Sequence, residues 1–493
     1  MKQDSAAERS FWPVHGFRPR SVVTTILIAC SLISGCAVGP NYRRPAIDAP
    51  AIFRGQEGAA QQASLADLPW WQVFKDDSLR DLIKTALTNN YDLRVAVRRI
   101  EQARAIEVQT RSQFFPQIGY EGDVARGKNS VRDNPIPNGG KTGNSALGIF
   151  NVAWEFDLWG RIRRADEAAR AQILANEEAR RGVMLSLVSD VAQAYFELLE
   201  LDLQLEIAKR TTQSFGDSLA IFRQRLEGGV ASRLETTRAE ASLASTAAVV
   251  PNLERLIAIK ENQINVLLGH TPGPVPRNAT LIQQQTPPEI PAGLPSVLLE
   301  RRPDIRQAEQ ELVAANAQIG VAVAEFFPKL GLTTFFGRVS PELSAFSSGK
   351  ANTWAVAGSL VGPIFQGGRL LGQYEQAEAQ WEEVKLRYQQ TALNAFQEVS
   401  NALTSRQKLE DVRAQQARAV TALADAVKVS LQRYVAGLSS YFEVLEAQQQ
   451  LFPAENALAQ TQLDQLVVVV QLYRALGGGW NVPDDKWAAP TQP

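Results

Sequence analysis

The chain carries one short motif twice: residues 114–120 read FFPQIGY, and residues 326–332 read FFPKLGL. In each copy the proline ends a predicted helix, over residues 92–115 and 304–327, that begins with an aspartate. After the proline, apolar and polar side chains alternate with a period of two, which predicts a β-strand. The motif therefore marks the place where helix changes to strand.

Each motif opens a predicted β-hairpin. A loop rich in glycine, proline and asparagine over residues 127–144 leads to a second alternating segment, and a loop rich in serine and glycine does so in the second copy. We predict hairpins over about residues 116–156 and 328–362, with strands of about ten residues that are apolar on one face. Aromatic residues lie near the strand ends, as in outer-membrane barrels, so we expect Trp154 and Trp354 at a lipid interface.

Internal repetition extends over most of the chain. Matched residues are 212 apart around the motif and 208 apart beyond it, so that Gly160-Arg161 matches Gly368-Arg369. A proline-rich stretch over residues 271–295 separates the copies and cannot form a regular helix. We predict a first repeat over residues 76–270, a second over residues 296–479 and a tail over residues 480–493. Further matched pairs are Asp92 and Asp304, Arg126 and Arg338, Arg225 and Arg433, Gly229 and Gly437, and Ser232 and Ser440.

A long helical hairpin follows each pair of strands, over residues 160–268 and 368–477. The stretch from 160 to 226 has no proline, and about 65 helical residues reach roughly 100 Å. Glycines at 228–229 and 437 predict the turns, and Pro251 predicts a kink or a break on the return. A long coiled-coil stalk would show the same periodicity, but the strand hairpins favour helices that continue a barrel.

Four strands do not close a barrel. Open strand edges are not tolerated in hydrocarbon, and bacterial barrels begin at about eight strands, so the chain must oligomerise. Two copies would give eight strands and three would give twelve, and this arithmetic does not choose between them.

The N-terminus resembles a bacterial lipoprotein signal. Two arginines precede an apolar run over residues 22–33 that ends in Ile33-Ser34-Gly35-Cys36. The resemblance implies that residues 1–35 are removed and that Cys36 carries diacylglycerol and an N-acyl chain, followed by an extended segment over residues 36–75. A rival site at Cys30 leaves an apolar core of only about six residues. Ala37 follows Cys36, where lipoproteins of the inner membrane commonly have aspartate, which points to the outer membrane.

The composition excludes several functional classes. The 51 Lys and Arg against 52 Asp and Glu give no basic excess for nucleic acid, and two Cys with two His are too few for a zinc cluster. The mature chain has no free thiol if Cys36 is acylated, and it has no glycine-rich phosphate loop. We expect no enzyme, no metal site and no cofactor besides the lipid on Cys36. His270, beside the proline-rich stretch, is expected to mark a helix end.

The whole pattern resembles the TolC-like outer-membrane factors, in particular the lipoprotein branch that serves RND-type efflux pumps. The resemblance rests on AVGPNYRRP at residues 37–45, both FFP hairpins, GPIFQGGR at residues 362–369 and the paired glycine turns. It implies a mainly α fold with a small transmembrane β part, in which a homotrimer forms a 12-stranded β-barrel continued by a 12-helix α-barrel. That channel would stand in the outer membrane of a Gram-negative bacterium and extend into the periplasm.

The resemblance also implies partners and a task. A periplasmic adaptor would link the channel to an inner-membrane RND-type transporter, while outer-membrane lipid surrounds the barrel. The chain would be a passive exit duct for drugs or other small toxic compounds. Metal-ion efflux, type I protein secretion or a non-channel envelope scaffold remain as alternatives.

Functional positions follow from the same resemblance. Tyr434 and Glu235 match a periplasmic gate, whereas Ser439 replaces the gating arginine of the family. Glu443 and Glu446 match acidic rings, and their spacing of three places both on one helical face. From the residues alone, the same positions also fit packing, solvated charges and helix caps. The helical tips expected to meet the adaptor carry Arg225, Gly229, Ser232, Arg433, Gly437 and Ser440.

Overall fold

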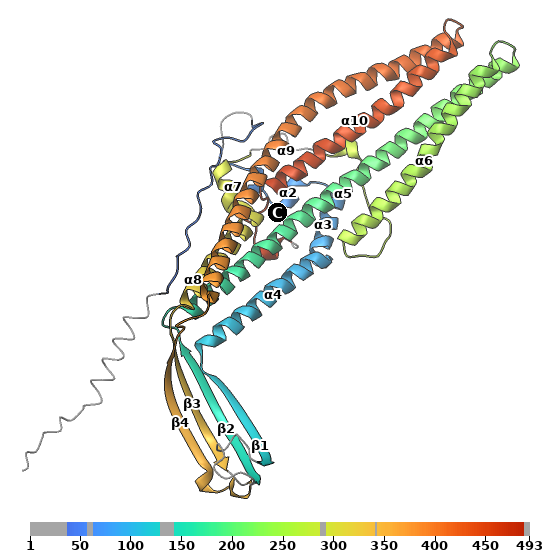
Figure 1. Ribbon diagram of the computed structural model, residues 1–493. Helices are drawn as coiled ribbons and strands as arrows, with labels where there is room; N and C mark the ends of the chain where they lie inside the picture. Colours follow the sequence, from blue (N-terminus) through green and yellow to red (C-terminus); the bar gives the residue numbers. More distant parts are fainter. Residues whose placement is uncertain (1–36, 57–62, 129–141, 286–291, 341–342, 488–493) are drawn as a thin grey trace, which may run out of the picture. The chain divides into compact units, whose positions relative to one another are not determined.

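The computed structural model describes residues 37–56, 63–128, 142–285, 292–340 and 343–487 (Figure 1). The predicted signal peptide and Cys36 lie outside the described residues, so lipidation stays a prediction. The chain divides into two compact units. One comprises the described residues up to Asn41 with Val108–Ala168 and Asn316–Glu378. The other comprises Tyr42–Glu107, Ala169–Ala315 and the described residues from Ala379 onward.

The first unit contains one antiparallel sheet in the order β1-β2-β3-β4 (Figure 1). Its strands are β1 (Gln117–Lys128), β2 (Thr142–Phe156), β3 (Lys329–Ser340) and β4 (Asn352–Val361). The two predicted hairpins pair with one another through β2 and β3, so β1 and β4 are the edges. In this register Tyr120, Phe150, Phe336 and Trp354 stand directly beside one another across the four strands.

Side chains alternate between the two faces of this sheet, as the period of two predicts. One face is apolar and largely exposed, with Ile118, Tyr120, Val124, Phe150, Phe336, Trp354, Val356 and Leu360. The opposite face carries most of the polar residues, including Gln117, Glu121, Asp123, Asn151, Glu155, Thr333 and Ser359. A sheet that exposes its apolar face suits lipid rather than water.

Helices make up most of the chain, and their order repeats in the two halves, which confirms the predicted fold class. Each half runs from a helix through two strands to a pair of long helices. The helices are α2 (Trp70–Val73), α3 (Asp77–Asn89), α4 (Tyr91–Arg111), α5 (Arg161–Glu227), α6 (Arg233–Leu267), α7 (Pro295–Arg301), α8 (Pro303–Ala324), α9 (Arg369–Val435) and α10 (Tyr441–Ala475). Short 3₁₀ turns are η1 (Leu65–Asp67), η2 (Ser112–Phe114), η3 (Leu281–Gln283), η4 (Leu343–Ala345), η5 (Gly349–Ala351) and η6 (Asp484–Lys486).

Three local expectations differ from the structure. The helices before the FFP motifs end at Arg111 and Ala324, earlier than predicted, because the chain tightens into i to i+3 turns before each proline. Helix α6 continues through Pro251 and does not break there. Residues 65–73, expected to be extended, include η1 and α2.

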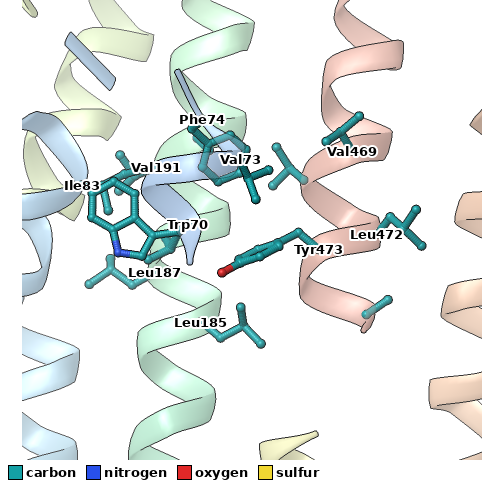
Figure 2. Close-up of a cluster of buried hydrophobic side chains, with 14 of the residues drawn as sticks. Trp70, Val73, Phe74, Ile83, Leu185, Leu187, Val191, Val469, Leu472 and Tyr473 are labelled. Carbon is teal, nitrogen blue, oxygen red and sulfur yellow. The ribbon is translucent and has the colours of Figure 1, made fainter. Parts of the chain in front are cut away.

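The second unit has a core that joins both repeats (Figure 2). Trp70 is 1% exposed and its indole nitrogen donates to the carbonyl of Trp487 at 3.3 Å. Tyr473 on α10 donates to the carbonyl of Leu68 at 3.1 Å. Helix α5 contains a window apolar enough to cross a membrane, but 67% of that window is buried inside the protein, where Leu185, Leu187 and Val191 pack in this core. The apolar character of α5 therefore serves packing.

Candidate functional site

The glycine turns at the helical tips have the same backbone geometry in both repeats. Gly229 and Gly437 each have φ +76°, and each is followed by a residue whose amide donates back to an arginine carbonyl. These bonds join Val230 to Arg225 at 3.0 Å and Leu438 to Arg433 at 2.8 Å. A β-carbon at either glycine would meet open space, so the positive φ, not crowding, requires glycine. Ser232 and Ser440 are the N-caps of the returning helices.

The structure brings together the two residues predicted to form a gate. The hydroxyl of Tyr434, at the end of α9, donates to Glu235 Oε2 at 3.2 Å, in the first turn of α6. The other carboxylate oxygen of Glu235 accepts from the amide and hydroxyl of Ser232, both at 3.4 Å. Glu235 is thus fixed by its own helix while it bonds to the other repeat.

Arg225 also belongs to this network. Its guanidinium carbon lies 4.6 Å from the centre of the Tyr434 ring, and Nη1 donates to the Tyr434 carbonyl at 3.0 Å. Phe222 meets the same ring edge-on at 5.1 Å. Arg433, the repeat counterpart, donates to the carbonyl of Leu438 in its own turn and makes no other side-chain hydrogen bond with the described residues. The two matched arginines therefore differ in their contacts, which the sequence comparison did not foresee.

Burial raises the pKa of Tyr434, and the neighbouring charge of Glu235 raises it further. The phenol therefore stays protonated at physiological pH and remains a donor to Glu235. The network holds one negative carboxylate with one positive guanidinium on the face of the tyrosine ring.

Ser439 takes no part in this network. Its hydroxyl oxygen is buried and has no hydrogen-bond partner among the described residues. Arg238 on α6 instead donates to the hydroxyl of Tyr441 at 3.2 Å. Arg225 and Arg238, both from the first repeat, thus each contact a tyrosine of the second repeat at this tip.

Glu443 and Glu446 are exposed on one side of α10, whereas Val444, Leu445 and Gln448 are buried on the other. Glu446 accepts from the amide of Gln450 at 3.2 Å, and within the described part of the chain neither glutamate forms an ion pair. They share a face, as their spacing predicts. Residues 37–56, 63–128, 142–285, 292–340 and 343–487 contain no group of three or more His, Cys, Asp or Glu that could hold a metal ion.

His270 follows the end of α6. Its backbone amide donates to the carbonyl of Asn265 at 2.8 Å, and its ring lies 3.4 Å from the amide of Asn89. Gly269 before it has φ +70° and closes the turn. The residue therefore sits at a helix end.

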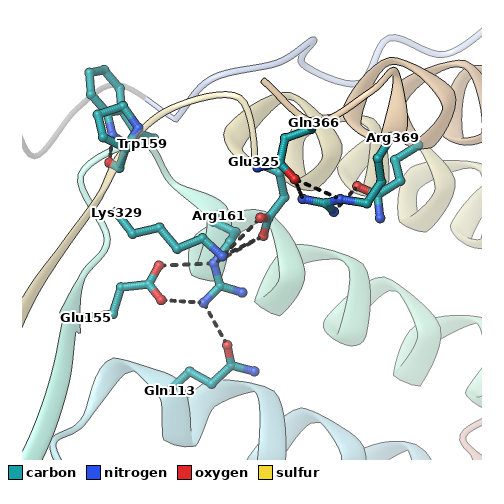
Figure 3. Close-up of polar contacts among 10 residues, drawn as sticks. Gln113, Glu155, Trp159, Arg161, Glu325, Lys329, Gln366 and Arg369 are labelled. Carbon is teal, nitrogen blue, oxygen red and sulfur yellow. Dashed lines mark hydrogen bonds and ion pairs between the residues drawn. The ribbon is translucent and has the colours of Figure 1, made fainter. Parts of the chain in front are cut away.

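Polar residues that the sequence analysis left without a role join the strands to the helices (Figure 3). Arg161 donates to both oxygens of Glu155, at 3.1 and 2.9 Å, and to Gln113 at 3.1 Å, while Glu325 lies 3.9 Å away. We call this group, with Lys329 bound to Glu325, the collar. The repeated Gly-Arg pair marked this place in the sequence, but its partners come from distant segments.

Arg164 holds residues 38–41, which follow Cys36 closely in the sequence. Its guanidinium donates to Asn41 Oδ1 at 2.7 Å and to the carbonyls of Val38 and Gly39 at 3.3 Å, and the side chain is 4% exposed. Gly39 has φ +92° and packs so closely on Gly320 that a β-carbon would lie 2.5 Å from its α-carbon. Residues 38–41 of the AVGPNYRRP motif are thus clamped within the first unit.

Comparisons with known proteins agree with this architecture. A family model described as outer membrane efflux protein matches residues 82–270 and 294–478, one match for each repeat. The probable efflux pump outer membrane protein TtgC of Pseudomonas putida is 34% identical over 463 residues, covering 92% of this chain and 95% of that relative. The cation efflux system protein CusC of Escherichia coli is 34% identical over 452 residues, covering 91% and 97%.

Solved structures agree as well. That of the outer-membrane channel OprN has a TM-score of 0.83 at 31% identity, covering 90% of this chain and 100% of its own. A structure of CusC, from work on transmembrane channel formation, has a TM-score of 0.80 at 33% identity, with the same coverage.

Proposed function

The chain belongs to the outer membrane efflux protein family, and from this premise we propose that three copies close into one barrel through which toxic compounds leave the cell. It is an outer-membrane channel protein of an efflux system. The assembly, the cargo and the roles of single residues are proposals.

The main support for this proposal is the four-stranded sheet, which has two open edges. Among the described strands β1 pairs only with β2, and β4 only with β3, so both edges expose unpaired backbone groups. Such edges are costly in hydrocarbon, and pairing β4 of one copy with β1 of the next removes them. Because the two edges are different surfaces, the contact runs head to tail and closes into a ring. Three copies of four strands give twelve, as the family resemblance implies.

Exposed apolar residues on the helices support the same contact. Tyr91 and Val95 on α4 are 65% and 49% exposed, and Leu386 and Leu393 on α9 are 61% and 62% exposed. Helix α9 is the repeat counterpart of α5, which has many more buried residues than α9. Neighbouring copies that cover α9 as the chain covers α5 would remove these residues from water.

The collar predicts one contact of the ring. Arg161 lies between Gln113 and Glu325, which occupy matched positions in the two repeats. Its counterpart Arg369 bonds only to Gln366 and Gln373 of its own segment within the described chain. If the second repeat makes the same contacts as the first, Arg369 should bind Gln113 of the next copy, as Arg161 binds Gln113 and lies near Glu325 within one copy.

We assign the periplasmic gate to Tyr434 and Glu235, with Arg225 in support and Ser439 outside it. Three copies of Glu443 and Glu446 would line a narrow bore with six carboxylates, which favours cations. The tips around Gly229 and Gly437 would meet a periplasmic adaptor that receives cargo from an inner-membrane RND-type transporter. The duct itself would be passive and catalyse no reaction.

The lipid anchor remains part of the proposal. Diacylglycerol on Cys36 and an N-acyl chain would hold the mature N-terminus at the membrane. The clamp between Arg164 and residues 38–41 supports this, because it fixes the chain immediately after Cys36.

Small toxic organic compounds are the proposed cargo, since relatives are named for solvent and antibiotic efflux. Cations are the second candidate, because a cation efflux protein is equally similar at 34% identity. Deleting the gene in a strain that expresses the cognate pump should raise intracellular accumulation of a fluorescent organic dye. If accumulation of a transition-metal cation rises instead, and Glu443→Gln with Glu446→Gln reproduces it, cations are the cargo. No change for either class would contradict efflux.

A further inference from the structure

The exposed apolar face of the sheet contains one hollow. It is a cavity of about 560 Å³ toward the loop ends of the strands. All four strands and the loop between β3 and β4 line it, with Tyr120, Gly122, Gly148, Phe336, Arg338, Phe346 and Asn352 among the lining residues.

Two glycines form the floor. Gly122 and Gly148 stand opposite each other in the register of β1 and β2, so neither strand fills the space with a side chain. A β-carbon on Gly148 would lie 2.8 Å from the ring of Phe346, which therefore folds over this face. The repeat counterparts of these glycines are Thr334 and Val356, which have larger side chains. The two glycines are therefore a feature of the first hairpin and not of the duplicated pattern.

An aromatic row borders the floor on one side. Tyr120, Phe150 and Phe336 are consecutive neighbours across β1, β2 and β3, and all three rings are exposed on this face. Rows of this kind mark the membrane interface in outer-membrane barrels. Phe346 lies over Gly148, whereas Gly122 is uncovered, and both the aromatic row and Phe346 line the hollow.

Arg338 supplies a positive charge in this apolar setting. It follows Phe336 by two residues on the same face, about 7 Å farther toward the loop end. Nη1 donates to the carbonyl of Phe346 at 3.1 Å, and within the described residues Arg338 has no ion pair with a carboxylate. A guanidinium next to hydrocarbon is costly unless it reaches an interface and an anion. Its fork of donors matches phosphate.

We propose that this hollow binds a phosphorylated glycolipid of the outer leaflet, lipid A of lipopolysaccharide. Arg338 holds a phosphate group at the level of the headgroups. One acyl chain lies on the glycine floor between the aromatic row and Phe346. The inference rests on the proposed assembly, which turns this face to lipid and its loop end to the outer leaflet. A trimer has three such sites.

Native mass spectrometry of the delipidated, detergent-solubilised full assembly tests the site. Bis-phosphorylated lipid A should be retained at up to three molecules per trimer. Arg338→Gln should weaken its binding about tenfold, the effect of losing one charge-assisted contact. Arg126→Gln is the matched control, because Arg126 is the exposed repeat counterpart of Arg338 on the same face but has no glycine floor beside it. Its affinity should stay within about twofold of the parent.

Two further binding measurements test whether the phosphate group and the acyl chain are both recognised. Dephosphorylated lipid A should bind the parent as weakly as intact lipid A binds Arg338→Gln. Gly122→Leu, which fills the part of the floor where a β-carbon now meets open space, should also reduce retention while the trimer mass persists. Equal affinity of the parent and Arg338→Gln, an equal loss in Arg126→Gln, or equally tight binding of phosphatidylglycerol would overturn the proposal. Loss of the trimer itself in the parent protein would instead contradict the proposed assembly.

Discussion

Tyr434 and Glu235 join the ends of two helical hairpins through one hydrogen bond of 3.2 Å. The carboxylate is held by Ser232 and the ring by Arg225 and Phe222, so both partners are oriented before they meet. A hydrogen bond to a charged group contributes about 1.5–3 kcal/mol. In the proposed trimer, one such bond in each copy would bias the tips toward a closed arrangement.

Tyr434→Phe removes the hydroxyl and keeps the ring against Phe222 and Arg225. The loss of one charge-assisted hydrogen bond per copy should raise the open probability in planar bilayers by about tenfold or more. Tyr441→Phe is the matched control, because its hydroxyl accepts from Arg238 and makes no contact with Glu235. An unchanged open probability in Tyr434→Phe would remove this pair from the gate.

The sequence placed Tyr434 and Glu235 correctly beside the glycine turns, because both positions are counted from residues that a positive φ requires to be glycine. It did not distinguish Arg225 from Arg433. Both look like cations at a helix C-terminus, and only the packing of one repeat on the other brings Arg225 to the tyrosine ring. Contacts between distant segments cannot be predicted from the spacing of residues along the sequence.

Helices α5 and α9 occupy matched places in the repeat and have the same length, 67 residues, but they lie in different surroundings. Helix α5 has many more buried residues than α9, and one of them is Glu200, which is 4% exposed. Burial raises the pKa of Glu200 to about 7, and Asp464 on α10 and Glu197 add to the rise, while a hydrogen bond from Gln204 opposes it.

This raised pKa makes the stability of the fold around α5 depend on pH. The folded state holds the proton more tightly than the unfolded chain, whose carboxyl has its ordinary pKa of 4.5. The contribution of Glu200 to stability is therefore greatest below about pH 4.5 and is lost as the pH rises through about 7.

Glu200→Gln should remove that dependence. At pH 8 the variant should be more stable than the parent by about 3 kcal/mol, and below about pH 4.5 the difference should vanish. Thermal unfolding of the solubilised protein at about pH 4, 5, 6, 7 and 8 measures it, with the exposed Glu206→Gln as the control on the same helix. A constant difference at every pH would contradict the buried, protonated carboxyl.

The alternation of side chains predicted the strands and their faces, because burial and lipid exposure act on every second residue. It did not give the register that aligns Tyr120, Phe150, Phe336 and Trp354, since that depends on which residues oppose one another across strands. Likewise the proline at 251 predicted a kink or break, but the surrounding turns of α6 sustain a continuous helix.

A single copy of the chain leaves several edges and apolar surfaces without a partner. Its sheet has two open edges, its apolar strand face is exposed, and α9 lacks the cover that α5 has. A further copy placed head to tail would pair the open edges and cover these surfaces. The number of copies could not be read from the chain, because strand counting allows eight or twelve, and the choice of three follows from the family.

Cross-linking at the collar tests the ring most directly. Gln113→Cys with Arg369→Cys, treated with a short bis-maleimide, should give covalently linked trimers on a denaturing gel, whereas each single variant should not. Gln113→Cys with Arg161→Cys is the matched control, because these side chains meet within one chain at 3.1 Å and should yield only cross-linked monomer. Linked dimers as the end product, or no linkage between chains, would contradict a channel closed by three copies.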